Sequence, residues 1–308
     1  MHATSTRSLI KVLGAALLLG RVSAAQGENL SLWVLGSGGP GATGRAGAGY
    51  IVSLDGKPRI LLDAGPGTFA RAGEAGVDLR QVDLVLLTHL HVDHAGELPG
   101  MIKARIVSER SDIEFKIFGP PSSVGGHGAA SFPSTTHFVD LLFGTHGAFG
   151  YLREFAGHVT LRARNVARSA QPQILLKEHD LTISAITGHH RDAPSVIYRI
   201  DYRGQSITFS GDIDVAGHAA LTRLAHNTDV LVFNAVVLDP PGSPPVLYTL
   251  RTAPRDIGRI AQTVGAKKLL LTHLNPAMDE ARAAVIASIR KSYPGPIDFA
   301  RDGLPYGP

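Results

Sequence analysis

The sequence predicts an α/β fold in which helices cover mixed β-sheets. Short apolar runs alternate with helical segments from residue 28 onward, and no long linker or low-complexity block interrupts them. The run VDLVLLTH at 82–89 is apolar enough for a strand buried on both faces. A length of 308 residues and a hydrophobic content of 44% are those of a globular chain with a sizeable core. We therefore expect one structural domain over residues 28–308.

The order of the elements follows from apolar runs and glycine-rich turns. In the first half we expect strands at 30–36, 49–54, 59–65, 82–89 and 113–119, with helices at 68–76 and 96–108. Residues 120–157 depart from this alternation and are predicted to be a helical insertion, with helices between 133 and 155. In the second half we expect strands near 158–166, 173–177, 181–187, 195–202, 205–210, 229–236 and 267–274, with helices at 216–225, 254–264 and 278–291.

The N-terminus has the three-part layout of a secretory signal peptide. Arg7 and Lys11 precede the apolar run VLGAALLLG, and the small residues VSAA follow it. We expect residues 1–25 to be removed by cleavage after Ala24 or Ala25, which predicts a periplasmic or secreted protein. The apolar run is too short to span a bilayer, so no membrane association of the mature form is expected.

Composition narrows the choice of ligands and partners. The chain has no cysteine, so any metal ion must be held by nitrogen and oxygen atoms. The net charge of +4 is spread along the chain without a Lys/Arg run. That balance suits a small anionic substrate, whereas nucleic-acid binding stays open but is not favoured. A homodimer also stays open.

The stretch HLHVDHAGE at 89–97 indicates a metal site. His89 and His91 are two residues apart and converge on one ion if the backbone is extended there. Asp93 and His94 then turn toward a neighbouring position. Imidazole and carboxylate are ligands that zinc accepts where thiolate is absent. Glu97 lies beyond the loop, where we expect it to cap a helix or to face solvent.

Three further strand ends carry the same residue types. His189 and His190 follow the strand in ISAITGHHRDAP, Asp212 follows ITFSG, and His273 ends LLLTH, which repeats the LLTH at 86–89. An apolar strand followed directly by a polar residue, four times over, indicates one site built on the edges of sheets. These patterns alone do not choose between His189 and His190.

Together these motifs resemble the metallo-β-lactamase fold superfamily, whose hallmark is the His-x-His-x-Asp-His loop. The likeness covers nearly all of the chain after the signal peptide, from VLGSGGPG through LLDAGPGT and LLTHLHVDHAGE to Ser-Gly-Asp at 210–212 and LLLTH at 269–273. Within the superfamily the chain is similar to the branch of ribonuclease Z, zinc arylsulfatases and class II cyclic-nucleotide phosphodiesterases, and most of all to secreted arylsulfatase-like members. The resemblance implies a four-layer αβ/βα sandwich, with two mixed sheets packed face to face.

The resemblance also implies a role for each candidate side chain, with two zinc ions as cofactors and manganese as an alternative. One ion would be held by His89, His91 and His190, the second by Asp93, His94 and His273, and Asp212 would bridge the two. His190 is preferred to His189 because of its spacing from Pro194. Asp63 would either orient a ligand imidazole or cap the next turn.

These roles predict a di-zinc hydrolase that cleaves phosphodiester or sulfate ester bonds with a metal-bridged hydroxide, Asp93 acting as general base. The glycine-rich turn at 36–49, which contains Arg45, could approach the anionic ester with its backbone N–H groups, but a purely structural turn is the favoured interpretation. One departure from ribonuclease Z is that Phe233 and Asn234 stand where its proton-donating histidine is expected, while His218 and His226 are expected to face solvent.

Two alternatives follow from the same pattern. One is a ribonuclease Z-type 3′ tRNA-processing endonuclease. The other is a non-catalytic scaffold that binds metal on the same fold. β-Lactam hydrolysis is less favoured, because a bridging Asp212 within Ser-Gly-Asp is not the β-lactamase pattern.

Overall fold

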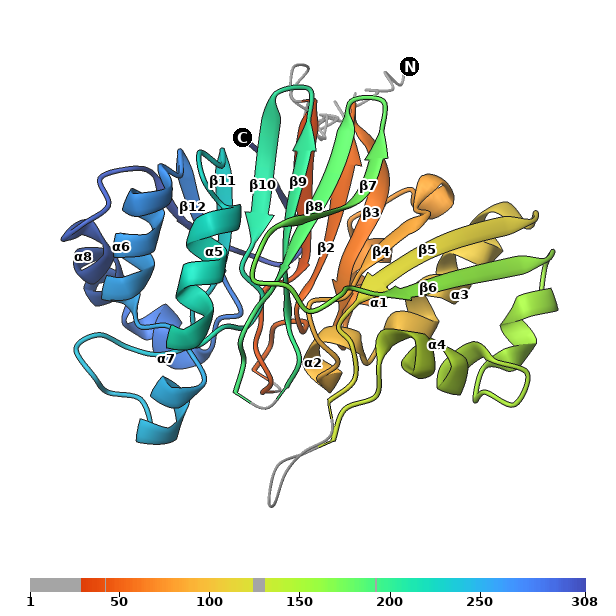
Figure 1. Cartoon of the computed structure of the whole chain (residues 1–308), viewed down its shortest axis with the longest axis horizontal. Helices are drawn as coiled ribbons and strands as arrows, with labels where there is room; N and C mark the ends of the chain where they lie inside the picture. The colour runs from red at the N-terminus through yellow and green to blue at the C-terminus, as the bar shows by residue number, and fades with distance from the viewer. Residues whose placement is uncertain (1–28, 42, 124–130, 192) are drawn as a thin grey trace, which may run out of the picture.

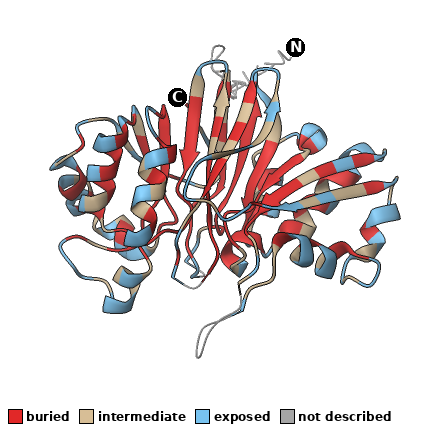
Figure 2. Ribbon diagram, viewed as in Figure 1, coloured by how far each residue is buried: buried red, intermediate tan, exposed pale blue. Residues whose placement is uncertain are grey.

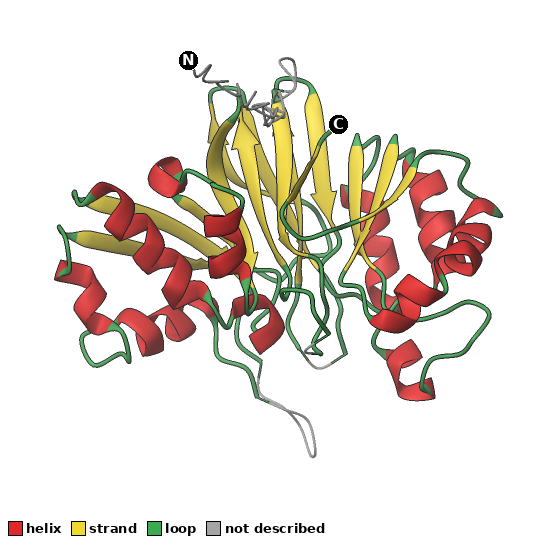
Figure 3. Ribbon diagram, turned by 180° about the vertical axis from the view of Figure 1, so that it is seen from behind, coloured by secondary structure: helices red, strands yellow, loops and turns green. Residues whose placement is uncertain are grey.

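Two seven-stranded sheets pack face to face and carry helices on both outer faces (Figures 1 and 3). The computed structural model describes residues 29–41, 43–123, 131–191 and 193–308. This arrangement confirms the predicted α/β class and the four-layer sandwich. The predicted signal peptide lies outside the described residues.

The first sheet comes from the N-terminal half and one C-terminal strand. Its order is β14-β1-β2-β3-β4-β5-β6. Strands β14 to β3 pair antiparallel, whereas β3 to β6 pair parallel. The bounds are β1 Leu30–Gly36, β2 Gly49–Leu54, β3 Lys57–Ala64, β4 Leu84–Leu86, β5 Ile113–Gly119, β6 Val159–Asn165 and β14 Leu304–Tyr306.

The second sheet is assembled from the C-terminal half in the order β13-β12-β11-β10-β9-β8-β7. Strands β7 to β10 pair antiparallel and β10 to β13 pair parallel. The bounds are β7 Gln173–Glu178, β8 Leu181–Thr187, β9 Val196–Tyr202, β10 Gln205–Phe209, β11 Val230–Asn234, β12 Lys268–Thr272 and β13 Ile297–Phe299.

Helices α1 to α4 flank the first sheet and α5 to α8 flank the second (Figure 1). Their bounds are α1 Thr68–Glu74, α2 Val92–Ala95, α3 Leu98–Glu109, α4 Thr135–Phe143, α5 His218–Leu224, α6 Pro254–Val264, α7 Pro276–Glu280 and α8 Arg282–Arg290. The described residues also form 3-10 helices at η1 Leu79–Gln81, η2 Gly150–Glu154, η3 Val215–Gly217 and η4 Pro245–Thr249. In the described part of the chain, the helices are too short or too polar to cross a membrane.

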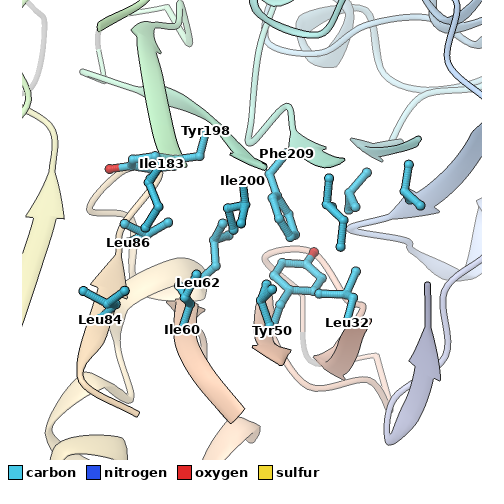
Figure 4. Packing of buried hydrophobic residues seen from close by; sticks show 14 of the residues in the cluster. Leu32, Tyr50, Ile60, Leu62, Leu84, Leu86, Ile183, Tyr198, Ile200 and Phe209 are labelled. Atoms are coloured by element: carbon cyan, nitrogen blue, oxygen red, sulfur yellow. The ribbon is translucent and has the colours of Figure 1, made fainter. Parts of the chain in front are cut away.

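The central core lies between the inner faces of the two sheets, where alternate residues of each strand meet (Figure 4). The rings of Tyr50 and Phe209 lie 5.5 Å apart across this interface. The Tyr198 hydroxyl donates a hydrogen bond of 3.0 Å to the Leu87 carbonyl. Figure 2 shows buried residues concentrated in the central strands. This packing fixes the two sheets relative to each other, and so fixes the loops at their ends.

The structure differs from the sequence expectation at short elements. Only Leu84–Leu86 of the predicted strand 82–89 is paired as a strand, and the predicted helix 278–291 is two helices that meet at Ala281. Strands β13 and β14 were not predicted. Each is three residues long, too short for an alternating pattern to show.

Candidate metal centre

Seven imidazole and carboxylate side chains meet where strands of the two sheets end. Two of the three groups formed by their donor atoms share His94, and within each group these atoms lie within 4.8 Å of one another. The groups are His89, His91 and His190; His89, His94 and Asp212; and Asp93, His94 and His273. The structure therefore brings together the seven residues to which the resemblance assigns ligand roles.

The first-half residues come from the loop after β4 and from the start of α2. Asp63, at the end of β3, holds this loop. Its carboxylate accepts hydrogen bonds from the Thr88 backbone N–H at 2.7 Å and the Thr88 hydroxyl at 2.8 Å, and it lies 2.8 Å from Nδ1 of His94. Of the two roles considered for Asp63, the geometry matches orientation of a ligand imidazole.

The second-half residues follow three separate strands. His190 comes after β8, Asp212 after β10 and His273 after β12. His273 has a backbone φ of 58° and Asp63 one of 55°, which is the left-handed region that side chains other than glycine seldom adopt. Such conformations cluster at functional sites, where the surrounding structure imposes them.

The choice between His189 and His190 is visible in their contacts. His190 is buried, its Nε2 lies 3.6 Å from Asp212, and its Nδ1 lies 3.2 Å from the Leu250 carbonyl oxygen. His189 instead pairs with Asp214 at 2.7 Å and has a half-exposed side chain. His190 is therefore the one that faces the cluster.

Asp212 lies at the centre of the cluster. Its carboxylate is 3.5 Å from Nε2 of His273 and 3.7 Å from Nε2 of both His89 and His94. The Nδ2 amide of Asn234 donates to Oδ1 of Asp212 at 2.7 Å, which orients the carboxylate. A fully buried carboxylate surrounded by imidazoles from both sheets has the position of a bridging group.

The histidines of the cluster differ in the direction in which their pKa values are shifted. Burial lowers the pKa of His190 to about 4 and lowers the pKa values of His89, His91 and His273. These imidazoles are neutral at pH 7, which is the form that coordinates metal. Burial acts in the same direction on His94, but Asp63 and Asp212 raise its pKa to about 10.

The two carboxylates are ionised. Burial would raise the pKa of Asp93, but the hydrogen bond from His273 and the nearby His94 bring it to about 2. Burial would also raise the pKa of Asp212, and the Arg251 charge with His273 and His94 holds it well below its usual range.

The residues present fit a pair of divalent cations. Nε2 of His94 and Nε2 of His273 lie 3.1 Å apart and point at each other, an arrangement that requires a proton or a cation between them. Oδ2 of Asp212 makes no hydrogen bond among the described residues, although the Arg251 guanidinium contacts it as an ion pair. Nitrogen and carboxylate donors without thiolate are a set that zinc and manganese accept.

Phe233 and Asn234, which stand where the proton-donating histidine is expected, face opposite sides of β11. Phe233 is not on the side of the cluster: its ring is fully buried in the apolar cluster between the second sheet and its helices, and the next residue, Asn234, faces Asp212. Alternation along β11 explains this, since adjacent residues face opposite sides. His226 is exposed as expected, but His218 is half-buried with Nε2 2.9 Å from the Thr252 hydroxyl.

Arg45 makes structural contacts. Its guanidinium forms a bidentate ion pair with Asp279, at 2.7 and 2.8 Å, and donates to the Ser37 hydroxyl at 2.7 Å. Arg45 thus ties the glycine-rich turn to α7. Glu97 caps a helix as expected, although that helix is α1, because its carboxylate accepts from the Phe69 backbone N–H at 2.8 Å.

Sequence reasoning missed Arg251. This residue lies between η4 and α6, is buried, and its Nη1 contacts the Asp212 carboxylate. A lone arginine in a loop has no spacing pattern, so only the fold reveals that it reaches the cluster.

Two mixed sheets between helical layers, with a cluster of imidazoles and carboxylates at the strand ends, define the metallo-β-lactamase fold with a candidate metal centre. Solved structures agree with this class at the level of the fold. The metallo-beta-lactamase fold protein YhfI from Bacillus subtilis is 20% identical and has a TM-score of 0.67, covering 91% of this chain and 99% of that one. Human tRNase Z, short form, is 19% identical with a TM-score of 0.66, covering 90% of this chain and 98% of that one.

Sequence comparison then places the chain in its family. The family model described as beta-lactamase superfamily domain matches residues 58–274, so the chain belongs to the metallo-β-lactamase superfamily. Among curated relatives, ribonuclease Z of Mycobacterium avium (strain 104) is 28% identical over 267 residues, covering 81% of this chain and 87% of that protein.

Proposed function

We propose that the protein is a hydrolase with two bound divalent metal ions that cleaves phosphodiester or sulfate ester bonds. One observation carries this proposal: Oδ2 of the buried Asp212 faces Nε2 of His89, His94 and His190 at 3.6–3.7 Å, and its Oδ1 lies 3.5 Å from Nε2 of His273. A carboxylate in that position can serve two ions at once.

The residues that would hold the ions divide into two sets around Asp212. His89, His91 and His190 would hold one ion, and Asp93, His94 and His273 the other. Two divalent ions, zinc or manganese, would supply an activated water at neutral pH and would neutralise the negative charge of a bound ester.

Asp93 is the proposed general base. It is buried, its carboxylate lies 3.3 Å from Nε2 of His273, and its pKa of about 2 leaves it ionised at neutral pH. When water attacks phosphorus or sulfur, a new bond to oxygen forms and the ester bond to the leaving oxygen breaks. Asp93 takes a proton from the water, and the departing oxygen takes one from solvent.

The side of the cluster next to β11 favours esters with good leaving groups. Asn234 occupies it with an amide that is already donating to Asp212, and an amide does not release a proton. Phenolates need less protonation than alkoxides to depart. We therefore expect activated aryl esters to be cleaved faster than alkyl esters.

A ribonuclease Z-type endonuclease is the second candidate. This candidate is supported by sequence similarity to relatives that are named ribonuclease Z, such as the one from Mycobacterium avium, which is 28% identical to this chain. A tRNA 3′ end is also a phosphodiester, so the same cluster would serve. The spread of charge along the chain gives this candidate no further support.

A substrate panel tests these proposals. The purified protein, loaded with zinc or with manganese, would be assayed on bis-aryl phosphate, aryl sulfate, a lactone, a β-lactam and a precursor tRNA. The proposal expects metal-dependent turnover of the phosphodiester or the sulfate ester, and loss of that turnover in Asp93→Ala. Equal rates with and without metal on every substrate would instead favour the non-catalytic scaffold.

We also propose that the protein is exported to the periplasm or secreted, on the basis of the N-terminal pattern in residues 1–25. N-terminal sequencing of the protein recovered from the producing cells tests this. A start near Ala25 or Gln26 is expected, and an intact Met1 would contradict the proposal.

A further inference from the structure

Arg251 is a buried cation beside the cluster that none of the proposed ligand roles requires. It is only 7% exposed, and its Nη1 contacts the Asp212 carboxylate. Asp212 is the counter-charge of Nη1, whereas Nε has no hydrogen-bond partner among the described residues. A guanidinium so deeply buried needs an anionic partner, because removing a charge from water is costly.

The backbone on both sides of Arg251 is anchored to the site. The Leu250 carbonyl oxygen lies 3.2 Å from Nδ1 of His190, and the Thr252 hydroxyl donates to the Ile213 carbonyl at 3.2 Å. Nε2 of His218 lies 2.9 Å from the same hydroxyl. Arg251 is thereby held with its side chain directed at Asp212.

The charge of Arg251 reaches both halves of the cluster. Burial lowers the pKa values of His190 and His273, and the Arg251 guanidinium lowers both further. His190 and His273 belong to different groups of candidate ligands. The guanidinium also contacts Asp212, which faces one imidazole of each group, so it is adjacent to both groups.

Asp212 cannot serve both the metal ions and Arg251 fully. It already faces four imidazoles and Asn234, and its charge would be shared with any ion that it binds. Asp212 is also the ion-pair partner found for Arg251 within the described residues. With metal bound, the guanidinium would be left without a full counter-charge, and an anionic substrate can supply one.

We propose that Arg251 binds a non-bridging oxygen of the substrate's tetrahedral oxyanion group, and so selects phosphate or sulfate esters over neutral esters. This inference rests on the proposed hydrolase function. The planar guanidinium presents paired N–H donors that match such oxygens. Arg251 makes and breaks no bond; it stabilises the charge on these oxygens during displacement.

The test measures binding of inorganic phosphate to the metal-loaded protein by isothermal titration calorimetry. Arg251→Met should weaken phosphate binding roughly 10- to 100-fold, the effect of losing a charge-assisted hydrogen bond. Arg251→Lys keeps the charge but not the fork of donors, and should fall between. Arg259→Met removes an exposed arginine of α6 and should bind phosphate like the parent chain.

Two further readouts separate the explanations. Metal content and melting temperature should stay unchanged in Arg251→Lys. If metal is lost from both Arg251 variants, the residue is a structural support of Asp212 and the inference fails. The loss of kcat/KM in Arg251→Met should be confined to anionic aryl phosphate, with a neutral aryl ester unaffected.

The outcomes also distinguish this inference from the proposed function. Phosphate affinity that is unchanged in Arg251→Met, in a protein that does cleave aryl phosphate, overturns only the role of Arg251. Phosphate binding that depends on Arg251, in a protein that cleaves no ester, supports the anion site and overturns the hydrolase proposal.

Discussion

The two halves of the cluster are built in different ways. The first half of the chain contributes four of the seven side chains from one short loop, residues 89–94, whereas the second half contributes three from separate strand ends. The loop depends on a side chain, Asp63, to hold His94 in place. His190 depends instead on the Leu250 backbone carbonyl. The contiguous loop is thus easy to recognise in the sequence, but a side chain, Asp63, holds it in place. The three residues from separate strand ends are positioned by the backbone of the sheet and its loops.

Removing the residue shared by the two halves should have the largest effect. Asp212→Ala should lower the metal content from two ions to less than one per chain. Turnover of aryl phosphate should fall more than about 100-fold, since changes outside the ligands alone cost roughly 10- to 100-fold. Metal analysis and a steady-state assay check this. The exposed Asp180→Ala, on a remote turn, should behave like the parent chain; two ions retained in Asp212→Ala would show that it bridges nothing.

Removing Asp63, which holds the loop at 89–94, should have the second-largest effect on metal binding. Asp63→Ala removes the group that orients His94 and should weaken metal binding roughly 10- to 100-fold. Competition with a chelating dye measures this. Asp63→Asn, which tolerates the positive φ of 55°, should retain part of the affinity. Equal losses in the two variants would point to the carboxylate charge alone, whereas full affinity in Asp63→Asn with a loss in Asp63→Ala would point to backbone strain at this position and contradict the prediction.

The glycine-rich turn packs against His273, so a substitution in this turn should destabilise the fold and weaken metal binding, by less than the loss of Asp63 does. A Cβ at Gly39 would lie 2.7 Å from Nδ1 of His273, so Gly39→Ala must displace the ring or the turn. We expect a loss of about 1–3 kcal/mol in the free energy of unfolding, with weaker metal binding. Chemical denaturation measures the first quantity. The matched control is Gly73→Ala in α1, where a Cβ meets nothing within 4 Å.

Removing His189, the sequence neighbour of His190, should give the smallest effect. His189→Ala removes a half-exposed pair with Asp214, and such pairs contribute about 0–1 kcal/mol. Metal content should therefore stay at the parent value, whereas His190→Ala should lose an ion. Metal analysis of the two variants side by side decides which histidine belongs to the cluster, and the reverse pattern would exchange their roles.

The parts that sequence could predict are those with a local pattern. The four strand ends that carry His89, His190, Asp212 and His273 were recognisable because an apolar run stops at a polar residue. The pattern could not say which way Phe233 points, since the phase of β11 is set by its neighbours in the sheet. Arg251 had no pattern at all, because it reaches Asp212 only through the path of the loop between β11 and α6. The short strands β13 and β14 exist because a sheet edge is available to pair with them.

The cluster joins residues from both sheets, which has a thermodynamic consequence for the whole chain. An ion bound there contacts both halves and binds the folded state alone, so its binding free energy adds to folding stability. At a free concentration 100 times its Kd, one such ion contributes about 2.7 kcal/mol. The melting temperature should then follow the free metal concentration of the surroundings, so that a chelator weakens the contact between the two sheets as well as the chemistry at their edge.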